Sequence, residues 1–122
     1  MSRLRYGPGR ITASEAAHRT HPAATATSVL LDVRETDEWQ AGHAPWAIHL
    51  PLSTLSSQVR LPPEARDRHL VVICRSGNRS RQAAELLTAQ GAGAVDVIGG
   101  MRDWATAGLP VVDQHGEDGT VT

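Results

Sequence analysis

The segment that decides the fold reads Val71-Val72-Ile73-Cys74-Arg75-Ser76-Gly77-Asn78-Arg79-Ser80-Arg81. An apolar run ends in the single cysteine of the chain, and a polar loop with two arginines and a glycine follows it. If the run is a strand, the Cys74 thiol lies at the C-terminal edge of a sheet, above a helix N-terminus. Unpaired N–H groups and the dipole of such a helix bind anions and favour a thiolate. We therefore expect a reactive, solvent-reachable sulfur, although a lone cysteine after an apolar run is more commonly an inert core residue.

Apolar and helical segments alternate along the rest of the chain, a pattern typical of an α/β fold with a mostly parallel sheet. Strands are expected over residues 10–12, 29–33, 47–50, 70–73 and 94–98. Helices are expected over residues 13–19, 36–42, 53–59, 82–90 and 101–107, with Thr36 and Ser53 as caps of the second and third. In open α/β sheets, ligands bind beyond the carboxyl ends of the strands. This places Cys74, Asp32 and Arg34 at one edge of the predicted sheet.

The bulk composition indicates one folded domain. The chain has 122 residues, of which 40% are hydrophobic, and a net charge of −1. We expect a flexible lead-in over residues 1–8, the domain over residues 9–112, and a disordered polar tail over residues 113–122. No apolar run approaches the ~20 residues that span a bilayer, and no secretory signal is present. We therefore expect a cytoplasmic protein with no membrane partner, in a compartment that keeps Cys74 reduced.

The basic residues exclude several classes of function. All twelve are arginine, so the chain has neither a P-loop lysine nor a lysine for a pyridoxal Schiff base. The arginines are scattered and the net charge is close to zero, so no nucleic-acid partner is expected. The six histidines show no metal-ligand spacing. We expect neither a metal site nor a cofactor.

Three motifs, in this order along the chain, resemble signatures of the rhodanese family of sulfurtransferases. The loop from Cys74 to Ser80 is similar to the active-site loop of that family. The upstream signature is matched by residues 31–35 with Glu38, Gly42 and His43, and the C-terminal signature by residues 99–101 with Trp104 and residues 108–111. The similarity runs from about Ile11 to Val112, but Ala44 and Trp46 replace the isoleucine and glycine usual in the family. The resemblance implies five central parallel strands with helices on both faces.

The resemblance also implies a function. A rhodanese-type enzyme moves a sulfane sulfur from a thiosulfate-like anionic donor to a thiol or cyanide acceptor, through a persulfide on the residue that matches Cys74. The substrate would be bound by the rest of the loop, which consists of Arg75, Ser76, Gly77, Asn78, Arg79 and Ser80. Its arginines suit charge-assisted contacts with an anion. Because the chain has no second cysteine, the acceptor must be an external thiol, on a small molecule or a protein.

Asp32 and Arg34 are candidates for a supporting role behind the loop. A structural ion pair between Arg34 and Glu35 or Glu38 is the simpler interpretation of the arginine. Two roles for Asp32 remain equal alternatives: it orients the loop or a neighbouring arginine, or it caps a following turn.

Two other functions remain open. The first is a cysteine-dependent phosphatase or arsenate reductase of the same fold. Phosphatases place their arginine six residues after the cysteine, whereas Arg79 lies five residues after Cys74. The second is a non-catalytic sulfur carrier or partner-binding module, for which an exposed Trp46 would be an anchor. A Trp46 ring folded over the edge of the core is the simpler alternative.

Overall fold

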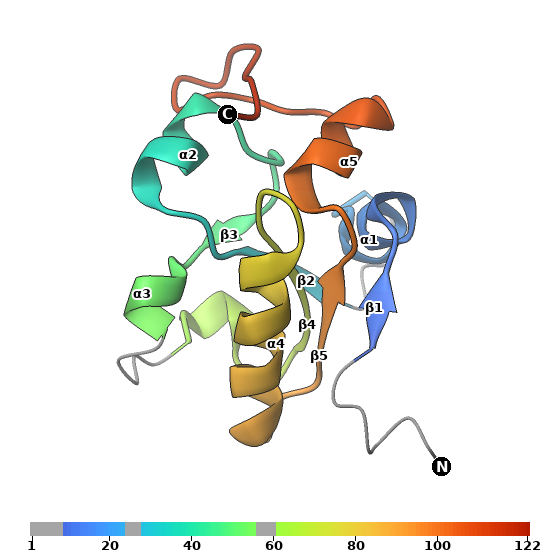
Figure 1. Ribbon diagram of the computed structural model, residues 1–122, viewed down its shortest axis with the longest axis vertical. Coiled ribbons are helices and arrows are strands. Elements are labelled where there is room, and N and C mark those ends of the chain that lie inside the picture. Colours follow the sequence, from blue (N-terminus) through green and yellow to red (C-terminus); the bar gives the residue numbers. More distant parts are fainter. Residues whose placement is uncertain (1–8, 24–27, 56–60) are drawn as a thin grey trace.

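The computed structural model describes residues 9–23, 28–55 and 61–122 (Figure 1). The strands are β1 (Arg10–Ile11), β2 (Ser28–Asp32), β3 (Ile48–His49), β4 (His69–Ile73) and β5 (Ala94–Val97). The helices are α1 (Ala13–Thr20), α2 (Thr36–Ala41), α3 (Leu52–Leu55), α4 (Asn78–Ala89) and α5 (Gly100–Thr106), with a 3-10 turn η2 (Pro63–Ala65) before β4. The predicted lead-in over residues 1–8 lies outside the described residues.

The five strands form one sheet in the order β1-β5-β4-β2-β3, and every pairing is parallel. This confirms the predicted α/β class. The central strand β4 pairs with β2 on one side and β5 on the other, so that Ile73 lies opposite Asp32 and Val72 lies opposite Asp96. The carboxyl ends of the three middle strands therefore meet at one edge of the sheet, where the loop after Ile73 begins.

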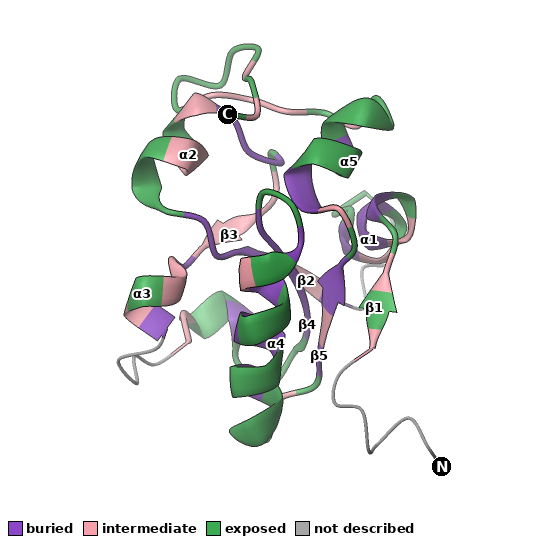
Figure 2. Ribbon diagram, viewed as in Figure 1, coloured by how far each residue is buried: buried purple, intermediate pink, exposed green. Residues whose placement is uncertain are grey.

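Helices cover both faces of the sheet, as predicted (Figure 1). One apolar cluster joins the sheet to α3, η2 and α4, and a second joins it to α1 and α5. Successive residues of β4 enter opposite clusters, since Leu70 and Val72 face the first while Val71 and Ile73 face the second. All four are fully buried, which is typical of a parallel strand covered on both sides. Figure 2 shows the same layering, with the most buried strands in the middle of the sheet and helices whose outer faces are exposed.

Several predicted helix ends differ from the structure. Thr12 caps α1 by accepting the N–H of Glu15 at 3.1 Å. At α2, Thr36 is the first helical residue and Glu35 is the cap, because the Glu38 carboxylate accepts the N–H of Glu35 at 3.1 Å. Helix α4 begins at Asn78, four residues earlier than predicted, and so includes Asn78, Arg79 and Ser80 of the expected loop.

The third predicted helix starts one residue earlier than expected. Helix α3 begins at Leu52, so Ser53 lies inside it and does not precede it as a cap. The predicted remainder of that helix, residues 56–59, lies outside the described residues. In the part of the chain that the structure describes, no helix has the length and apolar character needed to cross a bilayer.

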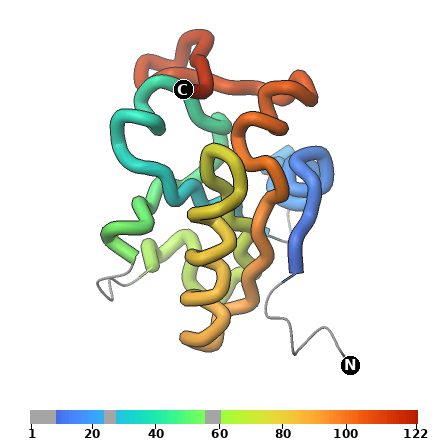
Figure 3. The backbone as a smooth tube through the Cα atoms, viewed as in Figure 1, coloured from blue at the N-terminus to red at the C-terminus, as the bar shows by residue number. Residues whose placement is uncertain are grey.

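The tail over residues 113–122 differs from the disorder that its polar composition predicted. It returns across the top of the domain beside α2 (Figure 3). Val112 forms antiparallel bridges with His43 and Asp118, and the N–H of Thr120 donates to the carbonyl of Ala41 at 2.9 Å. Val121 packs against the second apolar cluster. Backbone hydrogen bonds hold this segment in place, and such bonds cannot be inferred from the composition of its side chains.

Candidate active site

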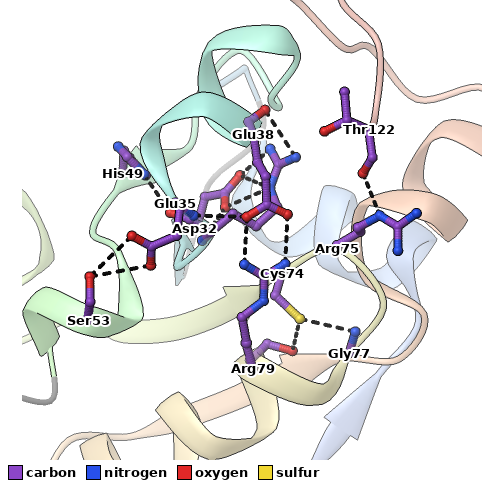
Figure 4. Close-up of polar contacts among 12 residues, drawn as sticks. Asp32, Glu35, Glu38, His49, Ser53, Cys74, Arg75, Gly77, Arg79 and Thr122 are labelled. Atoms are coloured by element: carbon purple, nitrogen blue, oxygen red, sulfur yellow. Dashed lines mark hydrogen bonds and ion pairs between the residues drawn. The ribbon is translucent and has the colours of Figure 1, made fainter.

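The loop after β4 curls back over its own cysteine. Gly77 adopts a left-handed conformation (φ 107°) as the N-cap of α4, and its N–H faces the sulfur of Cys74. The N–H donates to the Cys74 sulfur at 3.1 Å (Figure 4). Among the described residues, Gly77 supplies the one backbone N–H that donates to the sulfur. The predicted placement of the sulfur beside a helix N-terminus is confirmed.

The exposure of the sulfur differs from the prediction. Cys74 is only 1% exposed and belongs to the first apolar cluster. The reason lies in the strand alternation: Leu70, Val72 and Cys74 are two residues apart, so all three point to the same buried face. The side chain is therefore packed among apolar neighbours, while one amide still faces it. A hydrogen bond to sulfur is electrostatically stronger in such a water-poor environment.

A buried polar network lies beneath the loop. The Ser80 hydroxyl lies 3.4 Å from the Cys74 sulfur and donates to the Asp96 carboxylate at 3.0 Å. Arg10 holds the same carboxylate through two contacts of 2.9 and 3.1 Å, and it also donates to the Gly77 carbonyl at 3.1 Å. Ser80 and Asp96 are buried. The sequence predicted Ser80 as part of the loop but gave no sign of Arg10 or Asp96, because β1, β5 and α4 meet only in the folded chain.

The two loop arginines have different partners. The Arg79 guanidinium forms two parallel hydrogen bonds with the Glu38 carboxylate, of 2.6 and 2.7 Å (Figure 4). This hydrogen-bonded pair lowers the pKa of Glu38 and raises that of Arg79. Arg75 is exposed and donates from Nε to the backbone carbonyl of Thr122 in the tail at 2.5 Å. Ser76 and Asn78, two further residues of the loop, are also exposed.

Asp32 and Arg34 form a fully buried ion pair at the end of β2. Arg34 donates to the Asp32 carboxylate at 2.8 to 3.2 Å through Nη2 and Nε. It also donates to the carbonyls of Gly42 at 2.6 Å and Glu38 at 3.4 Å. The pair therefore anchors α2, which carries Glu38, and within the described residues neither side chain forms a hydrogen bond with the loop from Cys74 to Ser80. The prediction that Arg34 pairs with a glutamate side chain was wrong, because its partner is Asp32. Asp32 orients the Arg34 guanidinium and also accepts the backbone N–H of Arg34 at 3.0 Å.

The Gly99-Gly100 pair supports the loop from below. The N–H groups of Met101 and Arg102 donate to the carbonyls of Cys74 and Arg75 at 2.7 and 3.0 Å. Gly100 has a φ of 55°, and a Cβ there would overlap the Cys74 carbonyl. This approach explains why a glycine is needed at Gly100. The sequence showed the glycines as a turn, but it did not show what lay against them.

The tryptophan that departs from the usual family pattern packs inward. Trp46 donates from Nε1 to the Thr20 hydroxyl at 2.9 Å, and its ring lies 5.6 Å from the ring of Trp104. The ring of His21 also lies close to it, with 4.5 Å between the ring centroids. The ring therefore folds over the edge of the second apolar cluster, which favours the packing interpretation of Trp46.

With this geometry in view, comparison with known proteins identifies the class. The model of the rhodanese-like domain matches residues 12–107, and the chain belongs to that family. A protein named sulfurtransferase, from Allochromatium vinosum, is 39% identical over 95 residues, which cover 77% of this chain and 87% of that protein. The crystal structure of a rhodanese-related protein from Thermoplasma volcanium superimposes with a TM-score of 0.71 at 34% identity, covering 85% of this chain and 97% of that one.

A third relative differs in length. YrkF of Bacillus subtilis, which carries the name of a candidate sulfur carrier protein, is 37% identical over 76 residues. The match covers 62% of this chain and 40% of YrkF, so it spans less than half of that protein. The chain is therefore a rhodanese-like domain that has sulfurtransferase homologues and contains a single cysteine.

Proposed function

We propose that this protein is a sulfurtransferase that carries a sulfane sulfur as a persulfide on Cys74. The observation that supports this most directly is the Gly77 N–H, which donates to the Cys74 sulfur at 3.1 Å at the N-terminus of α4. That donor stabilises a sulfur anion, and the adjacent helix dipole acts in the same direction. The match to a sulfurtransferase at 39% identity points to the same chemistry.

The reaction has two balanced steps. The Cys74 thiolate attacks the outer sulfur of a thiosulfate-like donor, so that a bond between the two sulfurs forms. The bond from that sulfur to the sulfonate breaks, and sulfite leaves with the electron pair. An external thiolate or cyanide then attacks the terminal sulfur of the persulfide, which releases a new persulfide or thiocyanate and restores the Cys74 thiolate. Since the chain has one cysteine, a second protein or a small molecule must supply the acceptor.

The loop supplies the binding groups in this proposal. Arg75, Ser76 and Asn78 form the exposed rim, and Arg79 lies half-buried beside them. Because the Cys74 sulfur is buried, the proposed donor must present a small terminal sulfur, as a thiosulfate-like anion does. A free cysteine stays reduced in the cytoplasm, which we propose as the location.

A thiosulfate and cyanide assay tests the proposal. The wild-type protein should form thiocyanate, whereas Cys74→Ser and Cys74→Ala should form none. Intact-mass analysis after thiosulfate treatment should show one added sulfur atom in the wild type alone. Turnover of an aryl phosphate without thiocyanate formation would indicate the phosphatase alternative. An added sulfur without turnover to any thiol would indicate a carrier, the activity named for YrkF, and no adduct would leave a binding module.

A further inference from the structure

The described residues contain one closed circuit of hydrogen bonds around the Cys74 sulfur. Gly77 donates its N–H to the sulfur, and its carbonyl accepts from Arg10 at 3.1 Å. Arg10 holds Asp96, Asp96 accepts the Ser80 hydroxyl, and the Ser80 oxygen faces the sulfur at 3.4 Å. The loop, α4, β5 and β1 each contribute one or more members. Every group that touches the sulfur in this circuit is therefore held by a residue outside the loop.

The Ser80 hydroxyl has a single proton to donate, and two acceptors compete for it. When the sulfur is a neutral thiol, its S–H can donate to the Ser80 oxygen while the hydroxyl donates to Asp96. When the sulfur becomes an anion, the hydroxyl must turn toward it, because two lone pairs facing each other would repel. Asp96 then loses one of its partners in a buried position, which is costly unless another donor satisfies it.

Arg10 is that other donor. It contacts both Asp96 oxygens, at 2.9 Å from Nε and 3.1 Å from Nη2, so the carboxylate keeps a charged partner after Ser80 turns away. The hydrogen bonds of this pair raise the pKa of Arg10. The third Arg10 contact, to the Gly77 carbonyl, holds in place the glycine whose N–H donates to the sulfur.

We propose that Arg10 and Asp96 are positioning residues that allow Ser80 to act as a reversible hydrogen-bond donor to the Cys74 sulfur. Asp96 holds the hydroxyl while the sulfur is a thiol, and Arg10 lets Asp96 release it when the sulfur is a thiolate or a persulfide anion. This inference deepens the proposed function and rests on it, since sulfur transfer requires the anionic states.

Other charged groups near the sulfur also influence its charge. Arg79 interacts with it electrostatically from α4, and Glu38 of α2 neutralises much of that charge. Arg75 is next in the chain but is exposed and contacts the tail. Arg10 and Asp96 approach from β1 and β5. Their removal should therefore shift the ionisation of the sulfur in opposite directions.

The test follows the ultraviolet absorbance of the thiolate as a function of pH, in the full chain and without any sulfur donor. The single cysteine makes the signal specific once the same titration with Cys74→Ser is subtracted. Arg10→Met leaves Asp96 as an uncompensated anion and releases Gly77, so the midpoint should rise by about one pH unit. Asp96→Asn removes the negative charge and weakens the competing acceptor, because a neutral amide oxygen accepts a hydrogen bond less strongly than a carboxylate does, so the midpoint should fall by about one unit.

Arg19→Met is the matched control. Arg19 pairs with Glu15 on α1, and its side chain is 35% exposed against 37% for Arg10, but within the described part of the chain it forms no hydrogen bond or ion pair with the loop. Its midpoint should equal that of the wild type. Arg10→Lys keeps the charge without the guanidinium fork and should fall between the wild type and Arg10→Met. Opposite shifts for Arg10→Met and Asp96→Asn, in variants that keep a cooperative melting transition, support the proposal, and any other pattern overturns it.

A kinetic measurement separates this inference from the proposed function. If sulfur transfer occurs, Arg10→Met should lower kcat about tenfold and leave KM for thiosulfate unchanged, since Arg10 holds the sulfur environment and not the donor. If no variant transfers sulfur, the absorbance titration still tests the positioning roles, because it requires only a titrating thiol.

Discussion

The Arg79 guanidinium and the Glu38 carboxylate face each other through two hydrogen bonds of 2.6 and 2.7 Å, immediately beside the reactive loop. Both side chains are partly shielded, with 33% and 16% of their surfaces exposed. The arginine that the sequence assigned to an anionic substrate is therefore already paired with a carboxylate from α2. An anionic donor that binds Arg79 must compete with Glu38 for it.

Removing the Glu38 charge should strengthen the binding of an anionic donor. Glu38→Gln frees the Arg79 guanidinium, and we expect KM for thiosulfate to fall about three- to tenfold, which corresponds to the ~1 kcal/mol of a partly exposed pair. Steady-state thiocyanate formation measures it. Asp37→Asn, which removes a neighbouring exposed carboxylate on the same helix turn, is the control and should have little effect. A rise in KM equal to that of Arg79→Ala would mean instead that Glu38 positions Arg79 for the donor.

The same pair should make stability depend on pH. Because Arg79 lowers the pKa of Glu38 in the folded state, the pair stabilises the fold above the ordinary glutamate pKa of about 4.3. That contribution is lost as the pH falls through the lowered folded-state pKa. Urea unfolding at pH 7 should show Glu38→Gln less stable than the wild type by about 1 kcal/mol. At pH 2 the difference should vanish, and a constant difference would contradict the assignment.

Gly100 should be far less tolerant of alanine than Gly108. Both have a positive φ, 55° and 77°, so alanine introduces backbone strain of about 1 kcal/mol at each. At Gly108 the Cβ would enter open space, whereas at Gly100 it would overlap the Cys74 carbonyl. We expect Gly100→Ala to lose at least ~2 kcal/mol more in urea unfolding and to lose sulfur transfer as well. Equal losses for the two variants would show that the loop does not rest on Gly100.

Removing one member of the buried Asp32–Arg34 ion pair should strongly lower the free energy of unfolding. Arg34→Met leaves the Asp32 carboxylate buried without its charge partner, and we expect a loss of about 3–5 kcal/mol in the free energy of unfolding. The double variant Asp32→Leu/Arg34→Met removes both charges and should regain part of that loss. It cannot regain all of it, because the hydrogen bond from Arg34 to the Gly42 carbonyl is gone. A double variant less stable than the single one would refute the assignment of the loss to an unpaired charge.

The sequence by itself determined the class of fold, because alternating apolar and helical segments can bury their faces only in a layered parallel sheet. It also placed Cys74 at the end of a buried strand and before a turn that leads into a helix, since a lone cysteine between an apolar run and turn residues is a local pattern. The exposure of the sulfur was readable in principle from the two-residue spacing of Leu70, Val72 and Cys74.

Only the tertiary structure decided the partners of the charged groups. Arg10 and Asp96 are 86 residues apart, and Glu38 and Arg79 are 41 apart, so no local pattern relates them. The contacts of the tail could not be predicted for the same reason, because they involve carbonyls such as that of Ala41, far away in the chain. Side-chain alternation and turn chemistry are local and can be read along a sequence. Ion pairs and backbone contacts between distant segments depend on strand order and register, which exist only once the chain has folded.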